Sequence, residues 1–228
     1  MAASLLMISI VLGVLVFLPD DQSNILILII SFSIGYVVFS RTTTIYQHNG
    51  PGGTFNFTLD KHTGDEIHIL EVYKQVDTVF WQRYLIPFNY GPADLEGISI
   101  EDSRYLITDS EKIYITRDVY LDLKTNNELI VAMLTVDRVV GQDMLDPPVY
   151  NIPTLLASIE DNDRTQELDL PILTCENANE ARTVIWFKEG SENRIYKGND
   201  YCVIAEYVEG EDPVKIGTAL TYHIIGVM

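Results

Sequence analysis

Two apolar runs stand back to back at the start of the chain, separated by a short polar segment. The first run extends from Ala2 to Leu18 and the second from Ile25 to Phe39, and neither contains a charged residue. A helix of about 17 residues covers roughly 26 Å, slightly less than the roughly 30 Å hydrocarbon core of a bilayer. Uncharged flanking residues can complete each span, so the pattern predicts a transmembrane helical hairpin over residues 1–40.

Two other interpretations of this segment were weighed. A cleaved signal peptide needs a basic start and a small-residue cleavage site, whereas the chain begins Met-Ala-Ala-Ser and continues Phe-Leu-Pro after the first run. A buried hairpin of a soluble protein needs an amphipathic stripe, but Ile25–Ile30 is apolar on all sides. The transmembrane hairpin therefore fits best.

The side of the membrane depends on very few charges. Arg41, just after the second run, is the first basic residue of the chain, and the loop between the runs contains Asp20 and Asp21. The positive-inside tendency therefore predicts a cytoplasmic soluble domain. The glycosylation acceptor pattern Asn56-Phe57-Thr58 would suit the opposite orientation.

Thr42–Gly53 is expected as a polar exit from the membrane that ends in turn residues, and from Thr54 onward the alternation of apolar and polar positions predicts β-strands. The first strands form a block that ends at Pro87, and those after Gly97 read as an antiparallel meander. The expected strands are Thr54–Leu59, Glu66–Tyr73, Thr78–Ile86, Ile98–Ile100, Tyr105–Ile107, Ile113–Ile115 and Val119–Leu123.

The second half of the domain is less regular. The more continuous apolar run Glu128–Val140 predicts a central strand covered on both faces. Thr154–Ile159 and Thr174–Ala181 have short helical patterns. The strands are then expected to resume at Arg182–Lys188, Tyr201–Val208, Val214–Ile216 and Leu220–Val227.

These elements together predict the fold class. We expect a mainly β domain, a β-rich α+β fold of antiparallel strands, over residues 41–228, with possible subdomains at 41–148 and 149–228. It follows the membrane anchor at 1–40. This segment contains all 15 basic residues and all but two of the 33 acidic ones, so it is roughly 16 charges negative. Such a surface repels phosphate backbones and anionic headgroups, which argues against nucleic-acid binding.

Metal and cofactor sites are not expected. Two cysteines, Cys175 and Cys202, cannot build a four-ligand zinc site, and none of the histidines stands at ligand spacing with them or with another histidine. The two cysteines are either buried thiols or, outside the cytoplasm, a disulfide. The histidines are His48, His62, His68 and His223, of which His62 and His68 are expected as exposed residues at strand edges.

Catalytic motifs are also missing from the sequence. Glu160-Asp161-Asn162-Asp163 looks like the start of a calcium loop, but Gln166 and Ile172 occupy the positions where glycine and a bidentate glutamate are needed. Trp81 and Trp186 are expected as core or interface aromatics. A membrane-bound hydrolase or transferase would instead need a cleft that gathers several of Asp102, Asp109, Glu111, Glu160, Glu176 and Glu206.

One stretch of the C-terminal half resembles a known family. The residues from Glu192 to Glu206, with Ile195 and Gly198, are similar to the "E-x-x-I-x-x-G-D-x-V-Y-V-x-G" strand-turn-strand of the GIDE domain. This β-rich, membrane-tethered domain occurs in some mitochondrial RING-type E3 ubiquitin ligases and in prokaryotic relatives. Upstream, Trp81, Pro87-Phe88 and Gly97-Ile98-Ser99-Ile100 resemble that family's "W … P-F … D-x-x-G-x-x-x-V" region.

The chain also departs from the family. Ala205 stands where glycine is usual, the two apolar runs lie together at the N-terminus, and no RING follows. Ligase activity is therefore not carried over, and the resemblance implies a scaffold or partner-binding domain at a membrane. We expect a membrane-anchored, non-enzymatic interaction or scaffold domain, with the bilayer contacted through residues 2–39. A protein partner or self-association through Gly13 and Gly35 is also expected.

Overall fold

The computed structural model describes residues 42–62, 65–75, 78–117 and 127–228 of the chain. The predicted membrane hairpin and the predicted strand Val119–Leu123 lie outside these residues. Within them, no helix is both long enough and apolar enough to cross a bilayer. The chain divides into two compact units, one of residues 1–44 with 60–66 and one of residues 45–59 with 67–228.

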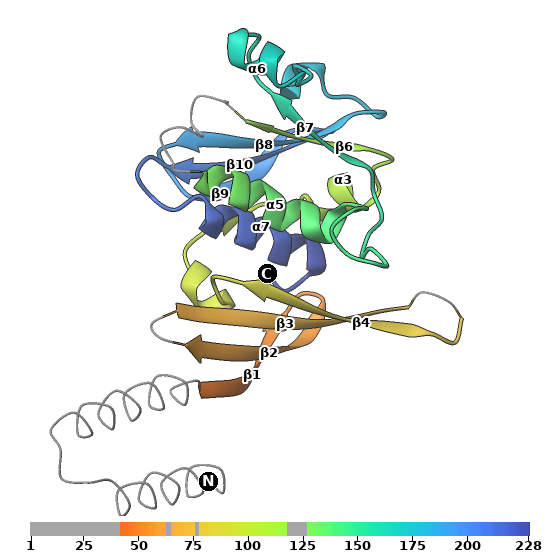
Figure 1. The fold of residues 1–228 in the computed structure, drawn as a ribbon, viewed down its shortest axis with the longest axis vertical. Coiled ribbons are helices and arrows are strands. Elements are labelled where there is room, and N and C mark those ends of the chain that lie inside the picture. Colours follow the sequence, from red (N-terminus) through yellow and green to blue (C-terminus); the bar gives the residue numbers. More distant parts are fainter. Residues whose placement is uncertain (1–41, 63–64, 76–77, 118–126) are drawn as a thin grey trace, which may run out of the picture. The chain divides into compact units, whose positions relative to one another are not determined.

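Four strands near the start of the described chain form one sheet, in the order β1-β2-β3-β4 (Figure 1). Along β4, buried and exposed side chains alternate strictly, as in a strand with one face on the core and one in water. The sheet therefore forms from the alternating pattern that the sequence shows. The strands are β1 (Thr42–Gly50), β2 (Gly53–His62), β3 (Asp65–Gln75) and β4 (Trp81–Phe88).

A second, six-stranded sheet has the order β5-β9-β10-β8-β6-β7. Its β10 pairs antiparallel with β9, but the pairs β10 with β8, β6 with β8, β6 with β7 and β5 with β9 are parallel. The β-rich α+β class is confirmed, whereas this sheet is mixed and not an antiparallel meander. Its strands are β5 (Ser99–Ile100), β6 (Ile113–Arg117), β7 (Thr154–Ser158), β8 (Thr183–Gly190), β9 (Arg194–Asn199) and β10 (Cys202–Val208).

Two long helices, α5 (Glu128–Val140) and α7 (Val214–Ile225), lie against one face of the six-stranded sheet (Figure 1). The buried residues of α5 recur every three or four positions, which is the stripe of a helix that packs on a core. The two helices approach closely at Gly217, where a Cβ atom would lie 2.6 Å from the carbonyl oxygen of Ala132. Glycine is therefore required at this helix crossing.

These helices correct several expectations from the sequence. Glu128–Val140 is a helix and not a central strand, and both Val214–Ile216 and Leu220–Val227 belong to or follow α7. The parallel connection from β6 to β7 explains the first error, because parallel strands need a long crossover that is usually helical. The expected strand Tyr105–Ile107 lies in the short helix α3 (Arg104–Thr108).

The two expected short helices also differ. Thr154–Ile159 contains the strand β7, and Thr174–Ala181 contains only the single 3₁₀ turn η2 (Cys175–Asn177). Among the residues that the structure describes, the remaining helical segments are the 3₁₀ turn η1 (Pro92–Leu95) and α6 (Asp163–Glu167). The strands expected near Arg182–Lys188 and Tyr201–Val208 are confirmed as β8 and β10.

Buried apolar side chains form two clusters. In the larger cluster, Phe57 and Phe88 on the inner face of the first sheet pack with side chains from α5, α7 and the six-stranded sheet. Tyr222 of α7 contacts both of these phenylalanines, with ring centroids 5.7 and 4.7 Å away. The smaller cluster contains Val184, Cys202 and Ile204. Cys175 and Cys202 form a disulfide with a Cα–Cα distance of 5.3 Å, which decides between the two alternatives left open by the sequence.

Candidate functional site

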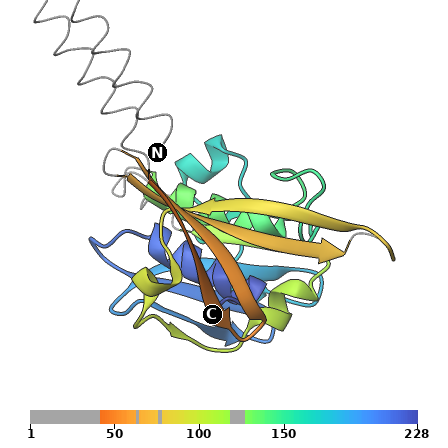
Figure 2. The ribbon, with the colours of Figure 1, turned by 90° about the horizontal axis from the view of Figure 1, so that it is seen from below.

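The β3–β4 hairpin has two faces of different character. Its strands pair antiparallel, with Tyr73 opposite Arg83 and Gln75 opposite Trp81. Alternation along β4 places Tyr84, Ile86 and Phe88 in the core. The same alternation turns the intervening side chains outward, and both views of the fold show the hairpin projecting beyond the rest of the fold (Figures 1 and 2).

Apolar side chains gather on the outward face and at the tip of this hairpin. At the tip, Val79, Phe80 and Trp81 are consecutive, and their exposed fractions are 80%, 72% and 62%. Behind the tip, the exposed side chains of Tyr73 and Leu85 continue the apolar surface. Single exposed apolar residues are ordinary, whereas a group of them on one hairpin, here beside the ion pair of Arg83 with Glu71, is a candidate interaction surface. We call these five residues the hairpin surface.

The inward face of the hairpin is held in place by the rest of the unit. The hydroxyl group of Tyr84 donates to the carbonyl oxygen of Pro148 over 3.4 Å, and the ammonium group of Lys74 donates to that of Val149. The hydroxyl group of Tyr222 donates to the carbonyl oxygen of Tyr90 over 2.8 Å, just beyond β4. The hairpin surface is therefore presented on strands with a fixed position.

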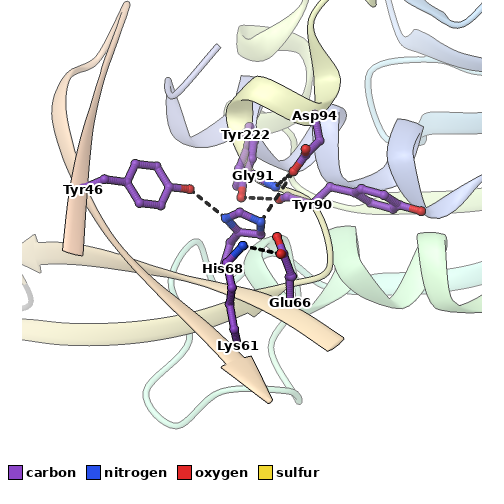
Figure 3. Close-up of polar contacts among 8 residues, drawn as sticks. All are labelled: Tyr46, Lys61, Glu66, His68, Tyr90, Gly91, Asp94 and Tyr222. Carbon is purple, nitrogen blue, oxygen red and sulfur yellow. Dashed lines mark hydrogen bonds and ion pairs between the residues drawn. The ribbon is translucent and has the colours of Figure 1, made fainter. Parts of the chain in front are cut away.

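A polar network lies at the base of the hairpin (Figure 3). The hydroxyl group of Tyr46 on β1 lies 2.8 Å from Nδ1 of His68 on β3, and Nε2 of His68 lies 3.5 Å from the Asp94 carboxylate. Because Nε2 faces a carboxylate, we assign the imidazole proton to Nε2 and the role of acceptor to Nδ1. The amide of Gly91 donates to the same carboxylate over 2.7 Å.

Tyr46, His68 and Asp94 follow the order of a nucleophile, a base and an orienting carboxylate. Whether Tyr46 could act as a nucleophile depends on its pKa. Burial, together with the nearby charge of Asp94, raises the pKa of Tyr46 to about 12. The phenol therefore stays protonated at neutral pH and acts as a hydrogen-bond donor to the imidazole. A Cβ atom on Gly91 would lie 2.6 Å from the His68 ring, so this ring packs directly against the backbone of Gly91. We conclude that the network positions β3.

Two of the six carboxylates proposed for a hydrolase lie at one cavity. Asp102 and Asp109, with Arg104, line a cavity of about 680 Å³ at which His223 is also found. The Nε2 atom of His223 accepts from the amide of Ser103 over 3.2 Å, and burial lowers the pKa of this imidazole. The hydrolase hypothesis stays a prediction that rests on this pair of carboxylates.

The other four carboxylates lie elsewhere. Glu111, Glu160 and Glu176 are exposed, whereas Glu206 is almost completely buried on β10. Its carboxylate accepts from Arg194 over 3.1 Å and from the hydroxyl group of Tyr196 over 2.9 Å. Burial acts to raise the pKa of Glu206, but the hydrogen bonds from Tyr196 and Arg194 outweigh it and the net shift is downward. This ionised carboxylate is satisfied inside the fold.

The remaining candidates from the sequence are two histidines, the metal-ligating residue types and the glycosylation acceptor Asn56. His68 is buried and not exposed at a strand edge, and the side chain of His62 lies outside the described part. In the described ranges, no group of three or more His, Cys, Asp or Glu side chains could hold a metal ion. Asn56 is exposed on β2, and its side-chain oxygen accepts from Gln47 over 3.0 Å. The acceptor residue Asn56 is thus at the surface, whereas Phe57 of the same pattern is buried.

Sequence reasoning identified Trp81 but not the surface to which it belongs. The available signal was the run Val79-Phe80-Trp81 beside a turn, where polar residues are the rule.

Comparisons of the chain with protein-family models, with curated proteins and with solved structures found no match. The segment Glu192–Glu206 contains the antiparallel pair β9 and β10, and its resemblance to the GIDE domain stays a prediction.

Proposed function

We propose that the chain is a membrane-anchored interaction domain. Residues 2–39 hold it at a bilayer as a transmembrane hairpin, and the hairpin surface makes its contact with a binding partner. The observation that carries this proposal is the exposure of the consecutive residues Val79, Phe80 and Trp81 at the start of β4, a strand whose other face is fixed in the core. Exposed aromatic side chains on a rigid support bind with little loss of conformational freedom.

The anchor is tested by placing one charge in each apolar run. In the double variant Val14→Arg with Ile29→Arg, each arginine adds about 2.5–3.5 kcal/mol to the free energy of helix insertion. We expect the unmodified chain to stay in the membrane pellet during alkaline carbonate extraction and the variant to be released. Release of the unmodified chain by carbonate would overturn the anchor.

The hairpin surface is tested by thiol labelling. Because the two native cysteines are joined, Phe80→Cys introduces the single free thiol of the chain. In open membrane fragments, we expect a membrane-impermeant maleimide to label this thiol roughly tenfold more slowly than in detergent, since a bound surface is covered. Leu155→Cys, at an exposed position on β7, is the matched control and should label equally in both. Equal rates at position 80 would contradict a bound hairpin surface.

We further propose that the domain faces the exported side of the membrane. The disulfide supports this side, because disulfides persist in oxidising compartments, and the exposed Asn56 is compatible with it. The expectation of a cytoplasmic domain depends on Arg41 alone. In sealed right-side-out vesicles, added protease should digest the domain, and protection would favour the cytoplasmic side.

A further inference from the structure

We propose that the cavity beside α3 binds a free basic amino acid, a small ligand with one carboxylate and two cationic groups. The ligand carboxylate pairs with Arg104, and the two cationic groups pair with Asp102 and Asp109. No residue of the hairpin surface lines this cavity, so the inference does not depend on the proposed interaction function.

Three segments that are distant in the sequence form the cavity. They are the turn between β1 and β2, the helix α3 with the residues beside it, and the end of α7. The amide of Gly52 in the turn donates to the carbonyl oxygen of Gly226, just after α7, over 2.7 Å. The amide of Ser103, just before α3, donates to Nε2 of His223 on α7 over 3.2 Å. Hydrogen bonds therefore join the walls, and the volume of about 680 Å³ is ordinary for a small-molecule site.

The guanidinium group of Arg104 is held at the cavity without an ionic partner. A Cβ atom at Gly226 would lie 2.8 Å from Nη1 of Arg104, so the guanidinium group packs directly against this glycine. Within the described residues, no hydrogen bond or ion pair to this group is found. By contrast, Arg83, Arg164 and Arg194 each pair with a glutamate. Because a planar guanidinium group binds a carboxylate through two parallel hydrogen bonds, Arg104 provides an unused site for a ligand carboxylate.

Two carboxylates of the cavity stand at opposite ends of α3. Asp102 precedes the helix and Asp109 follows it. At 1.5 Å per residue, their Cα atoms are roughly 10 Å apart. The Asp109 carboxylate accepts from the hydroxyl group of Thr108 over 3.2 Å, and no hydrogen bond or ion pair to Asp102 is found in the described part of the chain. Both carboxylates can therefore accept from a ligand, at points far enough apart for the two ends of an extended side chain.

The charge of the cavity favours a ligand with one net positive charge. The Nε2 atom of His223 accepts from the amide of Ser103, so we place the imidazole proton on Nδ1, 3.4 Å from the carbonyl oxygen of Met228. Burial lowers the pKa of this imidazole, which is therefore neutral at pH 7. The lining groups that remain charged are two carboxylates and one guanidinium group. Their charges are the complement of those of a basic amino acid.

Apolar side chains also line the cavity. They are Ile100 and Met228, together with the ring of Tyr105. The methylene groups of a ligand side chain gain from contact with such a surface, which a small inorganic cation does not. The cavity therefore suits an organic ligand with charged ends and an apolar middle.

A series of ligands that each lack one charge tests the proposal. The probes are L-lysine and three analogues: cadaverine lacks the carboxylate, 6-aminohexanoate lacks the α-ammonium group, and norleucine lacks the side-chain ammonium group. Binding of each probe to the full-length protein in nonionic detergent is measured by isothermal titration calorimetry. We expect lysine to bind and each analogue to bind roughly tenfold or more weakly, because one charged hydrogen-bonding group is lost each time.

Variants assign each charge to its residue. Arg104→Gln should weaken lysine binding to the level of cadaverine and leave cadaverine binding unchanged. Asp102→Asn and Asp109→Asn should each weaken the binding of both ligands roughly tenfold. Arg164→Gln, which loses only the exposed ion pair with Glu167 on α6, is the matched control and should bind lysine normally.

The other outcomes overturn the proposal. They are no measurable binding of lysine, equal binding of lysine and any of its three analogues, and unchanged lysine binding in all three cavity variants. Urea unfolding midpoints show whether the variants are folded, and the ligand series on the unmodified protein does not depend on them. Neither carbonate extraction nor labelling at position 80 depends on this cavity, so its failure and that of the proposed function are distinguishable.

Discussion

The hairpins β9–β10 and β3–β4 of the second unit are built from the same local motif but differ in how they are buried. In β9–β10, every residue of β10 from Cys202 to Tyr207 is buried, because β10 lies between β8 and β9 and both faces of the sheet are covered there. In β3–β4, the strand β4 is the edge of its sheet and buries only every second side chain. The β9–β10 hairpin belongs to the core, whereas the β3–β4 hairpin exposes one face to solvent.

Because of this difference, the outward residues of β4 can be substituted with little effect on folding stability, whereas those of β10 cannot. A substitution on β10 meets the core on either face, whereas a substitution on β4 meets the core or the solvent according to its position in the alternation. A substitution of an outward residue of β4 therefore costs little folding free energy. The apolar side chains at these outward positions are not required for stability.

The largest expected effect tests the two faces of β4 directly. Phe88→Ala removes a ring that is packed against Tyr222 with centroids 4.7 Å apart, and we expect it to lower the free energy of unfolding by about 3–5 kcal/mol. Leu85→Ala, on the exposed face, should change it by less than about 0.5 kcal/mol. Urea unfolding followed by circular dichroism measures both. Similar losses from the two variants would mean that the outward face is buried in solution.

The next largest effect concerns the disulfide, which involves the β9–β10 hairpin and not the β3–β4 hairpin. The disulfide joins η2 to β10 across a sequence separation of 27 residues, so its loss should cost about 3–4 kcal/mol in the chain-entropy estimate. The variant with both Cys175→Ser and Cys202→Ser should unfold at lower urea. Unmodified protein in reductant should match this variant, and if reductant leaves its midpoint unchanged, the bond is absent from the purified protein.

The two hairpins also show which parts of the fold the sequence could predict. Strands with one exposed face, such as β4, carry the alternating pattern, and the predicted strand Thr78–Ile86 overlaps β4 at Trp81–Phe88, although β1 at Thr42–Gly50 was not predicted. Buried segments lack it, and Glu128–Val140 was therefore interpreted as a strand although it is the helix α5. Its length of 13 residues is the signal that favours a helix. The edge strand β7 exposes the adjacent Leu155 and Leu156, and so its pattern resembled a helix.

The candidate site was less accessible to sequence reasoning. Exposure of Phe80 and Trp81 depends on the projection of the whole hairpin, which follows from the pairing of β3 and β4 and not from local pattern. The network at its base joins Tyr46, His68 and Asp94, which are distant in sequence and meet only when β1, β3 and η1 assemble. The spacing of these residues in the chain carries no signal of that contact.

A smaller effect is expected from the buried carboxylate on β10. Glu206→Gln removes the charge that Arg194 and Tyr196 contact, and we expect a loss of about 1–3 kcal/mol at neutral pH. Because the pKa of Glu206 is lowered in the folded state, this stabilisation is present above the ordinary value near 4.5 and is lost as pH falls through the lowered pKa. The difference in unfolding free energy between the two proteins should therefore shrink in acid. A difference that is constant with pH would show that the carboxylate is not ionised.

The smallest effect concerns the base of the projecting hairpin. Tyr46→Phe removes the hydroxyl group that donates to Nδ1 of the buried His68 while the ring stays stacked on Phe57 at 5.1 Å, so packing is kept and one hydrogen bond is lost. We expect a loss of about 1–2 kcal/mol, because the imidazole nitrogen is left without that partner in a site that water reaches poorly. Tyr73→Phe is the matched control, since its exposed hydroxyl group bonds to Glu71 at the surface, and its effect should be smaller. If the two variants lose the same stability in urea unfolding, the network at the base does not hold the hairpin, and the core contacts of Phe88 and Ile86 alone fix the strands that present the hairpin surface.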